Sequence, residues 1–365
     1  MRRIKLLILL LLFSSVSSGQ EESEQSSRVA AFTDIRDYFY IFSNGAPRQI
    51  ESQRIKEFTF GGDIVAYVNN ASNLIVWENN EKTNLGDITI TQYDVTNSLL
   101  YYKRDMVLAA WENNRLTHLT YFLRDYMVND EMIAFRDQNI DMLKVYHKGK
   151  VIEVEYTLTG ELGKFKVGKN SVAYINSSNY FKYYLDGALY ELDNFPPEEF
   201  DAGKSIVAYV AAASHIFQAF YNGKIVVLED IPPKNFQCGD ELVAYVSDEG
   251  HFKVYNNGKL IKVESFPPEY YKVLDETVLF FANNQLQVIR NGVRHILTSF
   301  APASYVMNQN SVAWKDQQGR LFMFDGNETQ EVTTELVSGY KLNKDLLSYR
   351  LPDKSYRIYY RGKVY

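Results

Sequence analysis

Val243-Ala244-Tyr245 is the tripeptide from which the architecture of this chain follows, because it recurs through the whole sequence. Identical copies begin at Val65, Val172 and Val207. Degenerate copies centre on Ala31, Leu100, Ala134, Leu279, Ala313 and Ser348, and neighbouring centres are 34 to 39 residues apart. A repeat of this period is one small supersecondary unit, which has to stack on its neighbours to bury its apolar faces.

A turn dipeptide recurs with the same period as the tripeptide. Thirteen to fifteen residues after the start of each copy stands a dipeptide that favours a tight turn. The ten dipeptides are Asn44-Gly45, Asn79-Asn80, Asn113-Asn114, Lys148-Gly149, Asp186-Gly187, Asn222-Gly223, Asn257-Gly258, Asn291-Gly292, Asp325-Gly326 and Arg361-Gly362. Such pairs suit two-residue hairpins, in which both central residues need a positive φ. Each unit is therefore expected to contain a β-hairpin at a fixed place.

The unit between Pro267 and Phe300 shows its parts most plainly. Four runs rich in β-branched and aromatic residues, 269–274, 277–282, 285–290 and 293–297, are separated by turn dipeptides. This pattern predicts a four-stranded antiparallel meander, whose strands we call a, b, c and d in chain order. No segment keeps a helical period over three turns, so the predicted class is all-β.

One four-stranded sheet cannot bury both of its faces, and radial stacking of such sheets produces a β-propeller. We predict about ten short blades in one ring. Two smaller rings, or a terminal unit that is not a true blade, are the alternatives, because propellers usually have four to eight blades. Strand a of the first unit would fall in residues 26–28, and the last unit would end at Tyr365 with a stub of strand d.

The sequence also resembles a known family. Gly239-Asp240-Glu241-Leu242-Val243-Ala244-Tyr245-Val246-Ser247-Asp248-Glu249-Gly250, followed by Phe252-Lys253-Val254-Tyr255, is similar to the blade motif of TolB-type, WD-repeat-like propellers. The likeness is tightest in repeats 5 to 7, and the family's Pro-x-Trp-Ser-Pro segment is replaced here by forms such as Phe236-Gln237-Cys238-Gly239. The resemblance implies a propeller fold and a periplasmic binding scaffold.

The first 20 residues are typical of a secretory signal. Arg2, Arg3 and Lys5 precede the apolar run 6–13, and small residues follow at 14–19. The apolar run is too short to span a bilayer, and no cysteine for lipid attachment stands near the cut site. We therefore predict a signal peptide at 1–20, a polar leader at 21–28 and the repeat domain at 29–365, in a secreted or periplasmic protein without a membrane anchor.

The charge balance narrows the class of partner. Without the three basic residues of the signal, 36 Lys and Arg face 45 Asp and Glu. An acidic exported protein is a poor candidate for binding nucleic acid or an anionic membrane surface. The single cysteine, Cys238, cannot form an internal disulfide, so stability has to come from burial.

One face of the predicted ring carries the candidate binding residues. In a meander blade, the d–a and b–c loops share one face. The central d–a loops contain Pro196-Pro197, Pro232-Pro233 and Pro267-Pro268, and His215 and His251 occupy matching b–c positions in adjacent units. These eight residues are the predicted binding face. The alternative is that the prolines only stiffen a connection and the histidines lie exposed on hairpin tips.

No catalytic signature is present. The sequence lacks a Gly-x-Ser-x-Gly elbow, a His-Glu-x-x-His motif, a phosphate-binding glycine loop and a Cys-x-x-Cys pair. No cofactor or metal is expected. The predicted function is a non-catalytic scaffold for a protein or cell-envelope partner. The alternatives are a glycan-binding or glycan-degrading propeller, to which Trp77 and Trp111 could contribute, and a ring that only braces a larger assembly.

Overall fold

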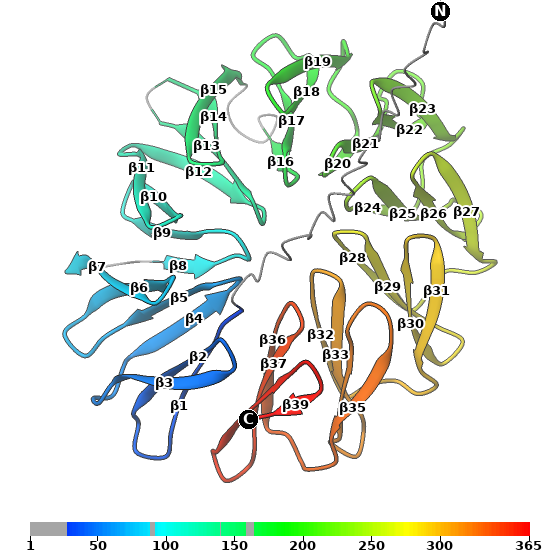
Figure 1. Ribbon diagram of the computed structural model, residues 1–365. Coiled ribbons are helices and arrows are strands. Elements are labelled where there is room, and N and C mark those ends of the chain that lie inside the picture. The colour runs from blue at the N-terminus through cyan, green and yellow to red at the C-terminus, as the bar shows by residue number, and fades with distance from the viewer. Residues whose placement is uncertain (1–27, 88–91, 139, 158–163) are drawn as a thin grey trace, which may run out of the picture.

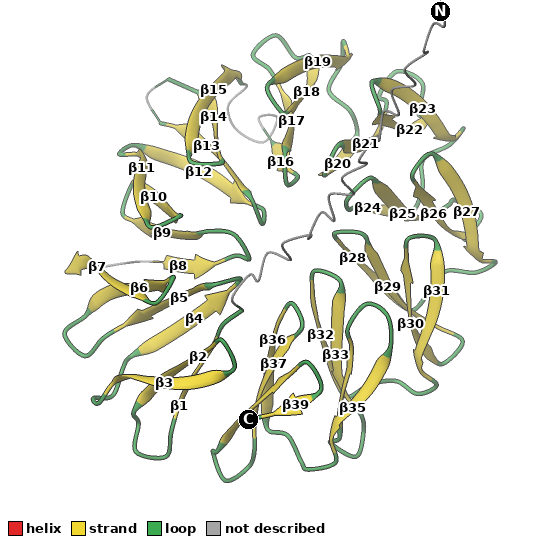
Figure 2. Ribbon diagram, in the orientation of Figure 1, coloured by secondary structure: helices red, strands yellow, loops and turns green. Residues whose placement is uncertain are grey.

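Ten antiparallel sheets follow one another around a central axis and form one ring (Figure 1). The computed structural model describes residues 28–87, 92–138, 140–157 and 164–365. Within these residues all regular structure is β-strand (Figure 2). The predicted all-β, ten-bladed ring is therefore confirmed, and the two-ring alternative is wrong.

Nine blades are four-stranded meanders with strand a innermost, and the first blade has three strands among the described residues. The a strands are β4 (Glu57–Gly61), β8 (Gln92–Val95), β12 (Leu123–Val128), β16 (Phe165–Val167), β20 (Glu199–Gly203), β24 (Asn235–Cys238), β28 (Tyr270–Leu274), β32 (Ser304–Asn308) and β36 (Gly339–Asn343). The b strands are β1 (Ala30–Thr33), β5 (Ile64–Val68), β9 (Leu100–Arg104), β13 (Met132–Asp137), β17 (Ser171–Ile175), β21 (Ile206–Val210), β25 (Leu242–Val246), β29 (Thr277–Ala282), β33 (Ser311–Lys315) and β37 (Leu346–Arg350).

The c and d strands complete each blade toward the outside of the ring (Figure 1). The c strands are β2 (Phe39–Ser43), β6 (Asn73–Glu78), β10 (Val107–Glu112), β14 (Met142–His147), β18 (Phe181–Leu185), β22 (Phe217–Tyr221), β26 (Phe252–Asn256), β30 (Gln285–Arg290), β34 (Leu321–Phe324) and β38 (Tyr356–Tyr360). The d strands are β3 (Ala46–Glu51), β7 (Glu81–Asp87), β11 (Arg115–Thr120), β15 (Lys150–Tyr156), β19 (Ala188–Asp193), β23 (Lys224–Glu229), β27 (Lys259–Glu264), β31 (Val293–Thr298), β35 (Thr329–Thr333) and β39 (Lys363–Val364).

The turn dipeptides join strands c and d, as the sequence predicts. In nine of the ten, both residues have a positive φ, for example 49° at Asn222 and 74° at Gly223. Asp325-Gly326 is the exception, because only Gly326 has a positive φ, at 103°. There the longer connection between β34 and β35 removes the need for a two-residue turn.

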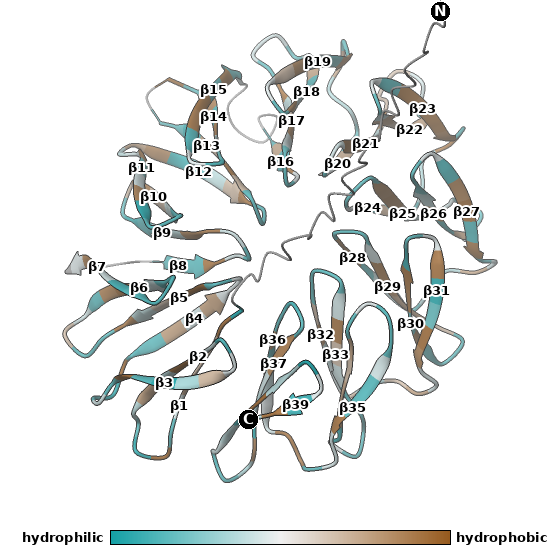
Figure 3. Cartoon of the chain, in the orientation of Figure 1, coloured by the Kyte–Doolittle hydropathy of each residue, from teal (hydrophilic) through white to brown (hydrophobic). Residues whose placement is uncertain are grey.

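In blades 4 to 10, strand b is buried along nearly all of its length. The central alanines Ala66, Ala173, Ala208 and Ala244 have no exposed surface. Their small side chains let the neighbouring sheet approach, and apolar clusters pack between successive blades, as in the cluster that joins Tyr209 to Phe181. Apolar residues lie along the strands of all blades, whereas most loops are hydrophilic (Figure 3).

The third unit departs from the predicted register by one residue. The sequence places Leu100 at the centre of strand b, but the pairing places Tyr101 there, since Asp94 pairs with Tyr101 as Thr59 pairs with Ala66. A hydrogen bond of 3.2 Å from the Thr59 hydroxyl to Asp94 confirms that these two a-strand positions correspond. In the sequence, Leu100 aligns with the alanines of the other units because leucine is apolar. The structure instead places the bulkier Tyr101 at that position.

The tyrosine of the repeated tripeptide fastens one blade to the next. The Tyr174 hydroxyl donates a 2.8 Å hydrogen bond to Glu155 at the end of β15 in the preceding blade, and Lys182 lies 3.1 Å from the same carboxylate. The same arrangement recurs with Glu229, Tyr245 and Lys253. Glu51 and Tyr67 make the same contact, but their lysine, Lys82, comes from strand d rather than strand c. We call each set a Tyr–Glu–Lys staple. At Tyr209 the hydroxyl instead donates to the Leu192 carbonyl, at 3.3 Å.

Among the described residues, the first and last blades exchange no strand. Blade 10 takes all four strands, including the predicted stub β39, from the end of the chain. The expected strand a of the first unit is not seen at Arg28, and residues 26 and 27 lie outside the described residues. The buried Asn343 side chain joins the ends, because its amide donates to the carbonyls of Val29 and Gly62 and its oxygen accepts from the Gly62 amide.

Two further findings concern the expectations from sequence. Among the described residues, no helix has the length and apolar character needed to cross a bilayer. Cys238 is the last residue of β24 rather than a turn residue. Burial raises the pKa of its thiol, which therefore stays protonated and unreactive at neutral pH.

Replacing Glu155 by Gln tests the staple that joins blades 4 and 5. Burial opposes ionisation of Glu155, but hydrogen bonds from Tyr174, Lys182 and Asn176 outweigh it and lower its pKa. A lowered folded-state pKa stabilises the fold above the unfolded value of about 4.3, and this stabilisation is lost as the pH falls. We expect Glu155→Gln to cost about 1–2 kcal/mol at pH 7 in urea unfolding, and clearly less at pH 3.5.

Glu153 is the matched control, since it lies on the same strand with 63% of its side chain exposed. Glu153→Gln should change the free energy of unfolding by less than about 0.5 kcal/mol. An equal penalty for Glu155→Gln at both pH values would contradict the ionic role of the staple.

Candidate functional site

The d–a crossovers and the b–c loops share one face of the ring, which we call the crossover face. In six blades, a backbone amide at the end of the crossover donates to a carbonyl at the end of strand b, which belongs to the last residue of the strand in five of them and to the last but one, Phe281, in the sixth. These bonds are Lys56 to Val68, Glu198 to Val210, Lys234 to Val246, Glu269 to Phe281, Ala303 to Lys315 and Ser338 to Arg350, at 2.8–3.0 Å. They hold the crossovers beside the b–c loops, as the sequence predicts.

Exposed apolar side chains recur along this face. Four successive crossovers place one at the same position of the repeat: Phe195, Ile231, Phe266 and Phe300, which are 57%, 49%, 44% and 71% exposed. The next crossover exposes Leu336, one residue further along, at 62%. We call these five residues the crossover row. Exposed apolar side chains that gather in a patch mark interaction surfaces.

The predicted prolines hold the row in place. Pro196, Pro232 and Pro267 directly follow row residues, and proline restricts the preceding residue to extended conformations. Pro197 is buried and Pro233 and Pro268 are half-buried, so the second proline of each pair anchors its crossover.

The end of strand d adds a further restraint on these connections. The Phe195 amide donates to Asp193, at 3.0 Å, and the Phe300 amide donates to the Thr298 hydroxyl, at 3.3 Å. The apolar side chains are therefore presented by a restrained backbone.

The two predicted histidines lie in b–c loops of this face but do not form a joint site. His215 Nδ1 lies 2.5 Å from the Glu198 carboxylate, which belongs to a crossover, whereas His251 Nδ1 lies 3.0 Å from Glu249 of its own loop. The loop of His251 does pack beside the predicted prolines, because a Cβ added to Gly250 would lie 3.6 Å from Pro267 Cδ. Within the described chain, no group of His, Cys, Asp and Glu is placed to hold a metal ion.

A cavity of about 360 Å³ opens beside the row, between the crossover at 298–302 and the b–c loop at 316–320. Trp314 forms its floor and stacks on Phe322 with ring centres 5.6 Å apart, and Phe300 lines its edge. Arg320 lies over Phe322 and pairs with Asp316 at 2.7 Å. The cavity is thus mainly apolar, with three aromatic residues and a few oriented polar groups in its lining, and suits an apolar side chain of a partner.

The tryptophans do not form a sugar-stacking surface. Trp77 and Trp111, equivalent in their c strands as the sequence indicates, are buried between blades, and so is Trp314. Trp111 Nε1 donates to Glu78 at 2.8 Å, which ties blades 2 and 3 together. Glu78 also accepts from the Asn114 amide, so this carboxylate has a structural role.

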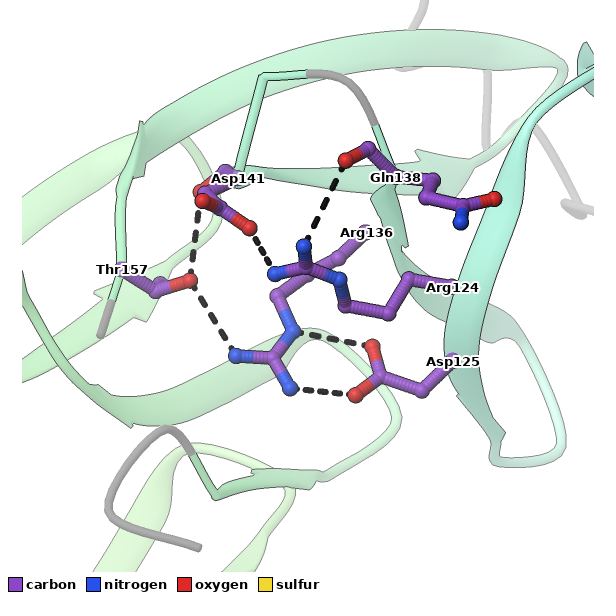
Figure 4. A network of polar contacts seen from close by, with 6 residues as sticks. All are labelled: Arg124, Asp125, Arg136, Gln138, Asp141 and Thr157. Carbon is purple, nitrogen blue, oxygen red and sulfur yellow. Dashed lines mark hydrogen bonds and ion pairs between the residues drawn. The ribbon is translucent and has the colours of Figure 1, made fainter. Parts of the chain in front are cut away.

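A second polar network lies where blade 4 meets blade 5 (Figure 4). The buried Arg136 guanidinium of β13 forms a two-pronged contact with Asp125 of β12, and a third nitrogen lies 3.4 Å from the Thr157 hydroxyl. Thr157 donates to the Asp141 carbonyl, and the Asp141 carboxylate pairs with Arg124. These contacts join β12, β13 and the b–c loop of blade 4 to Thr157, which follows β15.

The opposite face carries a charge cluster close to the ring axis. Lys169, in the a–b turn of blade 5, lies 3.0 Å from Asp240 in blade 7 and 2.6 Å from Asp275 in blade 8. Burial acts to lower the pKa of Lys169, but the two carboxylates outweigh it and raise the pKa, so the ammonium stays charged. The cluster joins turns two and three blades apart, and Lys204, 4.0 Å from Asp240, supplies the second positive charge.

This cluster is not among the predicted sites, although the sequence carries a signal for it. Lys169, Lys204, Asp240 and Asp275 each stand four residues before the centre of strand b in successive repeats. Aligning the repeats as columns shows opposite charges at one turn position, which predicts mutual contact when the turns converge on the axis. The crossover row follows from the same alignment, since each of its first four members precedes a Pro or an Ala-Pro pair.

Comparison with known proteins agrees with the ring. The model of a family described as the 10-bladed beta propeller domain matches residues 23–365. No curated protein matches the chain.

Similar solved structures share little sequence with this chain. The computationally designed Ika8 protein is 13% identical, with a TM-score of 0.38 over 74% of this chain and 96% of that one. The CRINKLY WD40 ectodomain of the Arabidopsis thaliana receptor kinase ACR4 is 10% identical, with a TM-score of 0.35 over 66% of this chain and 94% of that one. Hsv2 of Kluyvelomyces marxianus is 12% identical, with a TM-score of 0.34 over 66% and 92%.

Replacing Lys169 by Met tests whether the axial cluster holds the turns together. The change leaves two buried carboxylates without their cation, so we expect a loss of about 2–4 kcal/mol in the free energy of unfolding. Lys204→Met is the matched control. Lys204 lies 4.0 Å from Asp240 and is 44% exposed, so its loss should cost less than about 0.5 kcal/mol.

The triple variant Lys169→Met, Asp240→Asn, Asp275→Asn removes all three charges and should recover most of the stability lost by Lys169→Met alone. Equal penalties for Lys169→Met and Lys204→Met would contradict the assigned role.

Proposed function

Because this chain belongs to the 10-bladed β-propeller domain family, we propose that it is a non-catalytic binding scaffold that docks a partner protein on its crossover face. The ring supplies a broad, rigid platform, and the partner contacts the crossover row together with the cavity beside Trp314. The predicted face with its six prolines, His215 and His251 belongs to this surface. The proposal assigns no chemical step to the protein.

The crossover row is the observation that carries the proposal. Scattered exposed apolar residues are ordinary, but Phe195, Ile231, Phe266 and Phe300 repeat at one position in four successive blades. The apolar surface stays in water at a cost that burial against a partner would remove, at about 25 cal/mol for each Å². Aromatic anchors of this type dominate the binding energy of protein interfaces.

The restrained crossovers favour tight association. Proline-stiffened segments have little conformational entropy left to lose on binding, so more of the contact energy appears as affinity. The row is flanked mainly by exposed acidic residues, Glu198, Glu199, Asp230, Glu269 and Glu335, against Lys234. We therefore propose a partner surface with an apolar centre and a basic rim, a combination that gives complementarity and a faster encounter.

We further propose that the protein acts outside the cytoplasm. Residues 1–20 have the character of a secretory signal and residues 21–28 that of a polar leader, with the propeller beginning at residue 29. The similarity of the segment around Val243-Ala244-Tyr245 to TolB-type blades supports an envelope or secreted partner. A glycan ligand is less well supported, because the three tryptophans are buried.

Photo-crosslinking from the crossover face tests the scaffold proposal. A photoreactive residue at Phe266 should give one stoichiometric adduct with a protein in the native exported fraction. The same group at Asn257, an exposed c–d turn residue on the opposite face, should give none. The captured partner is then purified and its affinity for the wild-type propeller is measured.

The variant Phe195→Ser, Ile231→Ser, Phe266→Ser, Phe300→Ser should keep the fold and lower that affinity at least about tenfold, equivalent to about 1.4 kcal/mol. A control with Asn222→Ser and Asn257→Ser on the opposite face should bind as the wild type does. Equal crosslinking from both faces, or unchanged affinity in the fourfold variant, would refute the proposed surface.

A further inference from the structure

A cavity of about 350 Å³ opens where three blades meet. Ala31 of β1 in blade 1 lines it, together with residues of β4 in blade 2 and of β36, β37 and β38 in blade 10. Blades 2 and 10 are the two neighbours of blade 1 in the ring (Figure 1). Small-molecule sites in proteins have volumes of about 300–1,000 Å³, so the cavity has room for a small ligand. None of the five residues of the crossover row lines it.

Aromatic rings and cations make up most of the lining. The aromatic residues are Phe58, Phe60, Tyr340 and Tyr356. Within the described chain, the charged residues that line the cavity are Lys341 and Arg350, and both are basic. The chain as a whole has the opposite balance, with 39 Lys and Arg against 45 Asp and Glu. The lining therefore favours an anion with an apolar body.

The two cations lie on the same face of blade 10. Lys341 pairs directly with Ser348, and Arg350 stands two residues after Ser348 in the same strand. Directly paired residues share a face of a sheet, and so do alternate residues of a strand. Diagonal neighbours of this kind are about 7–8 Å apart, a distance that long side chains span. One carboxylate can therefore contact both cations.

The Arg350 guanidinium has no acidic partner within the described chain. Its Nε is buried and has no hydrogen-bond partner. The guanidinium lies over the Tyr356 ring, 5.7 Å from the ring centre, and Tyr356 in turn stacks on Phe32 of β1. A contact with a ring face orients a guanidinium but leaves the N–H donors at its edge free for an anion.

Blade 4 shows how the fold satisfies an arginine at this position. Arg136 pairs across the sheet with Asp125, just as Arg350 pairs across the sheet with Gly339. In blade 4 the two side chains form a two-pronged contact. Blade 10 has a glycine where blade 4 has the aspartate, and a Cβ added to Gly339 would meet no atom of another residue within 4 Å, apart from its chain neighbours. The space for a carboxylate beside Arg350 is therefore open.

Lys341 also lacks a carboxylate in direct contact. Its ammonium donates to the Thr59 hydroxyl, at 3.1 Å, and lies 4.2 Å from the centre of the Phe60 ring. Burial of the ammonium lowers the pKa of Lys341, and Asp94 opposes this shift only partly. No ion pair of Lys341 is found among the described residues. A bound anion would supply the missing opposite charge.

We propose that this cavity binds a small aromatic carboxylate. The Arg350 guanidinium binds the acid group through two parallel hydrogen bonds, in place of the carboxylate that Asp125 provides in blade 4, and Lys341 contributes the second positive charge. The ring of the ligand packs against the aromatic residues of the lining. An inorganic anion would leave these apolar contacts unused. The site is separate from the crossover row and does not depend on the proposed function.

Binding of 2-naphthoate to the purified full chain, measured by calorimetry, tests the proposed site. We expect one saturable site for each chain. The neutral 2-naphthamide, which has the same ring, and acetate, which has the acid group without the ring, should each bind at least about tenfold more weakly. Absence of saturable binding would overturn the proposal. So would an equal affinity for 2-naphthoate and 2-naphthamide.

Substitution of Gly339 tests the role of Arg350. Gly339→Asp places a carboxylate beside the guanidinium, as Asp125 lies beside Arg136, and should lower the affinity for 2-naphthoate at least about tenfold without lowering the melting temperature. Gly339→Ala is the matched control, because its Cβ enters open space, and its affinity should stay within about twofold of the wild type. Equal affinities of the two variants would refute the assignment.

A second pair of variants removes a charge instead of adding one. Arg350→Gln should also lower the affinity at least about tenfold, whereas Arg357→Gln, at an exposed arginine of β38 outside the cavity, should bind as the wild type does. Equal effects of these two changes would contradict the proposed site. The fourfold serine variant of the crossover row should keep its affinity for 2-naphthoate, so failure of the scaffold proposal and failure of this one are distinguishable.

Discussion

The close approach of neighbouring blades at strand b is the constraint on which the ring depends. Alanines without exposed surface allow two sheets to meet, and the tyrosine that follows each of them reaches the preceding blade. An isolated blade would expose its apolar surface to water. In the ring, each blade is stabilised by packing against two neighbours. The burial at strand b therefore determines the angle between blades and, with it, the number of blades that close the ring.

The polar groups in the core serve this same contact. A buried tyrosine hydroxyl needs a partner, and a glutamate at the end of the preceding outer strand provides one in three of the blade junctions. Each glutamate is shared with a lysine, so the charge that accompanies the hydrogen bond is balanced. Apolar contacts between sheets have little directional preference. The hydrogen bonds and ion pairs of the staples have a defined geometry, and they therefore fix the register of one sheet against the next.

The loops on the two faces of the ring pack differently. On the axial side, turns of many blades converge, and their charges neutralise one another in the cluster around Lys169. On the crossover face, the connections run from the outside of one blade to the inside of the next and lie over the surface. They tolerate exposed side chains there, and prolines hold those side chains still. One face thus completes the ring, while the other is free to carry a binding surface.

Much of this protein could be predicted from its sequence alone. The repeat period, the turn dipeptides and the alternation of apolar residues determined the class, the strand order and the ten blades, because these are local properties repeated ten times. The face that carries Pro196, Pro232 and Pro267 also followed from strand order. Charge and the N-terminal segment predict an exported, acidic protein without a nucleic-acid partner, and both expectations stay predictions.

Tertiary structure alone decided which of these residues meet. The contact of Lys169 with Asp240 and Asp275 joins residues 71 and 106 positions apart, and depends on how far the blades turn about the axis. The separation of His215 from His251 into two carboxylate pairs, the burial of Trp77 and Trp111, and the exposure of the crossover row depend on packing between blades. A sequence pattern describes each blade, but the distance between side chains of different blades is a property of the closed ring.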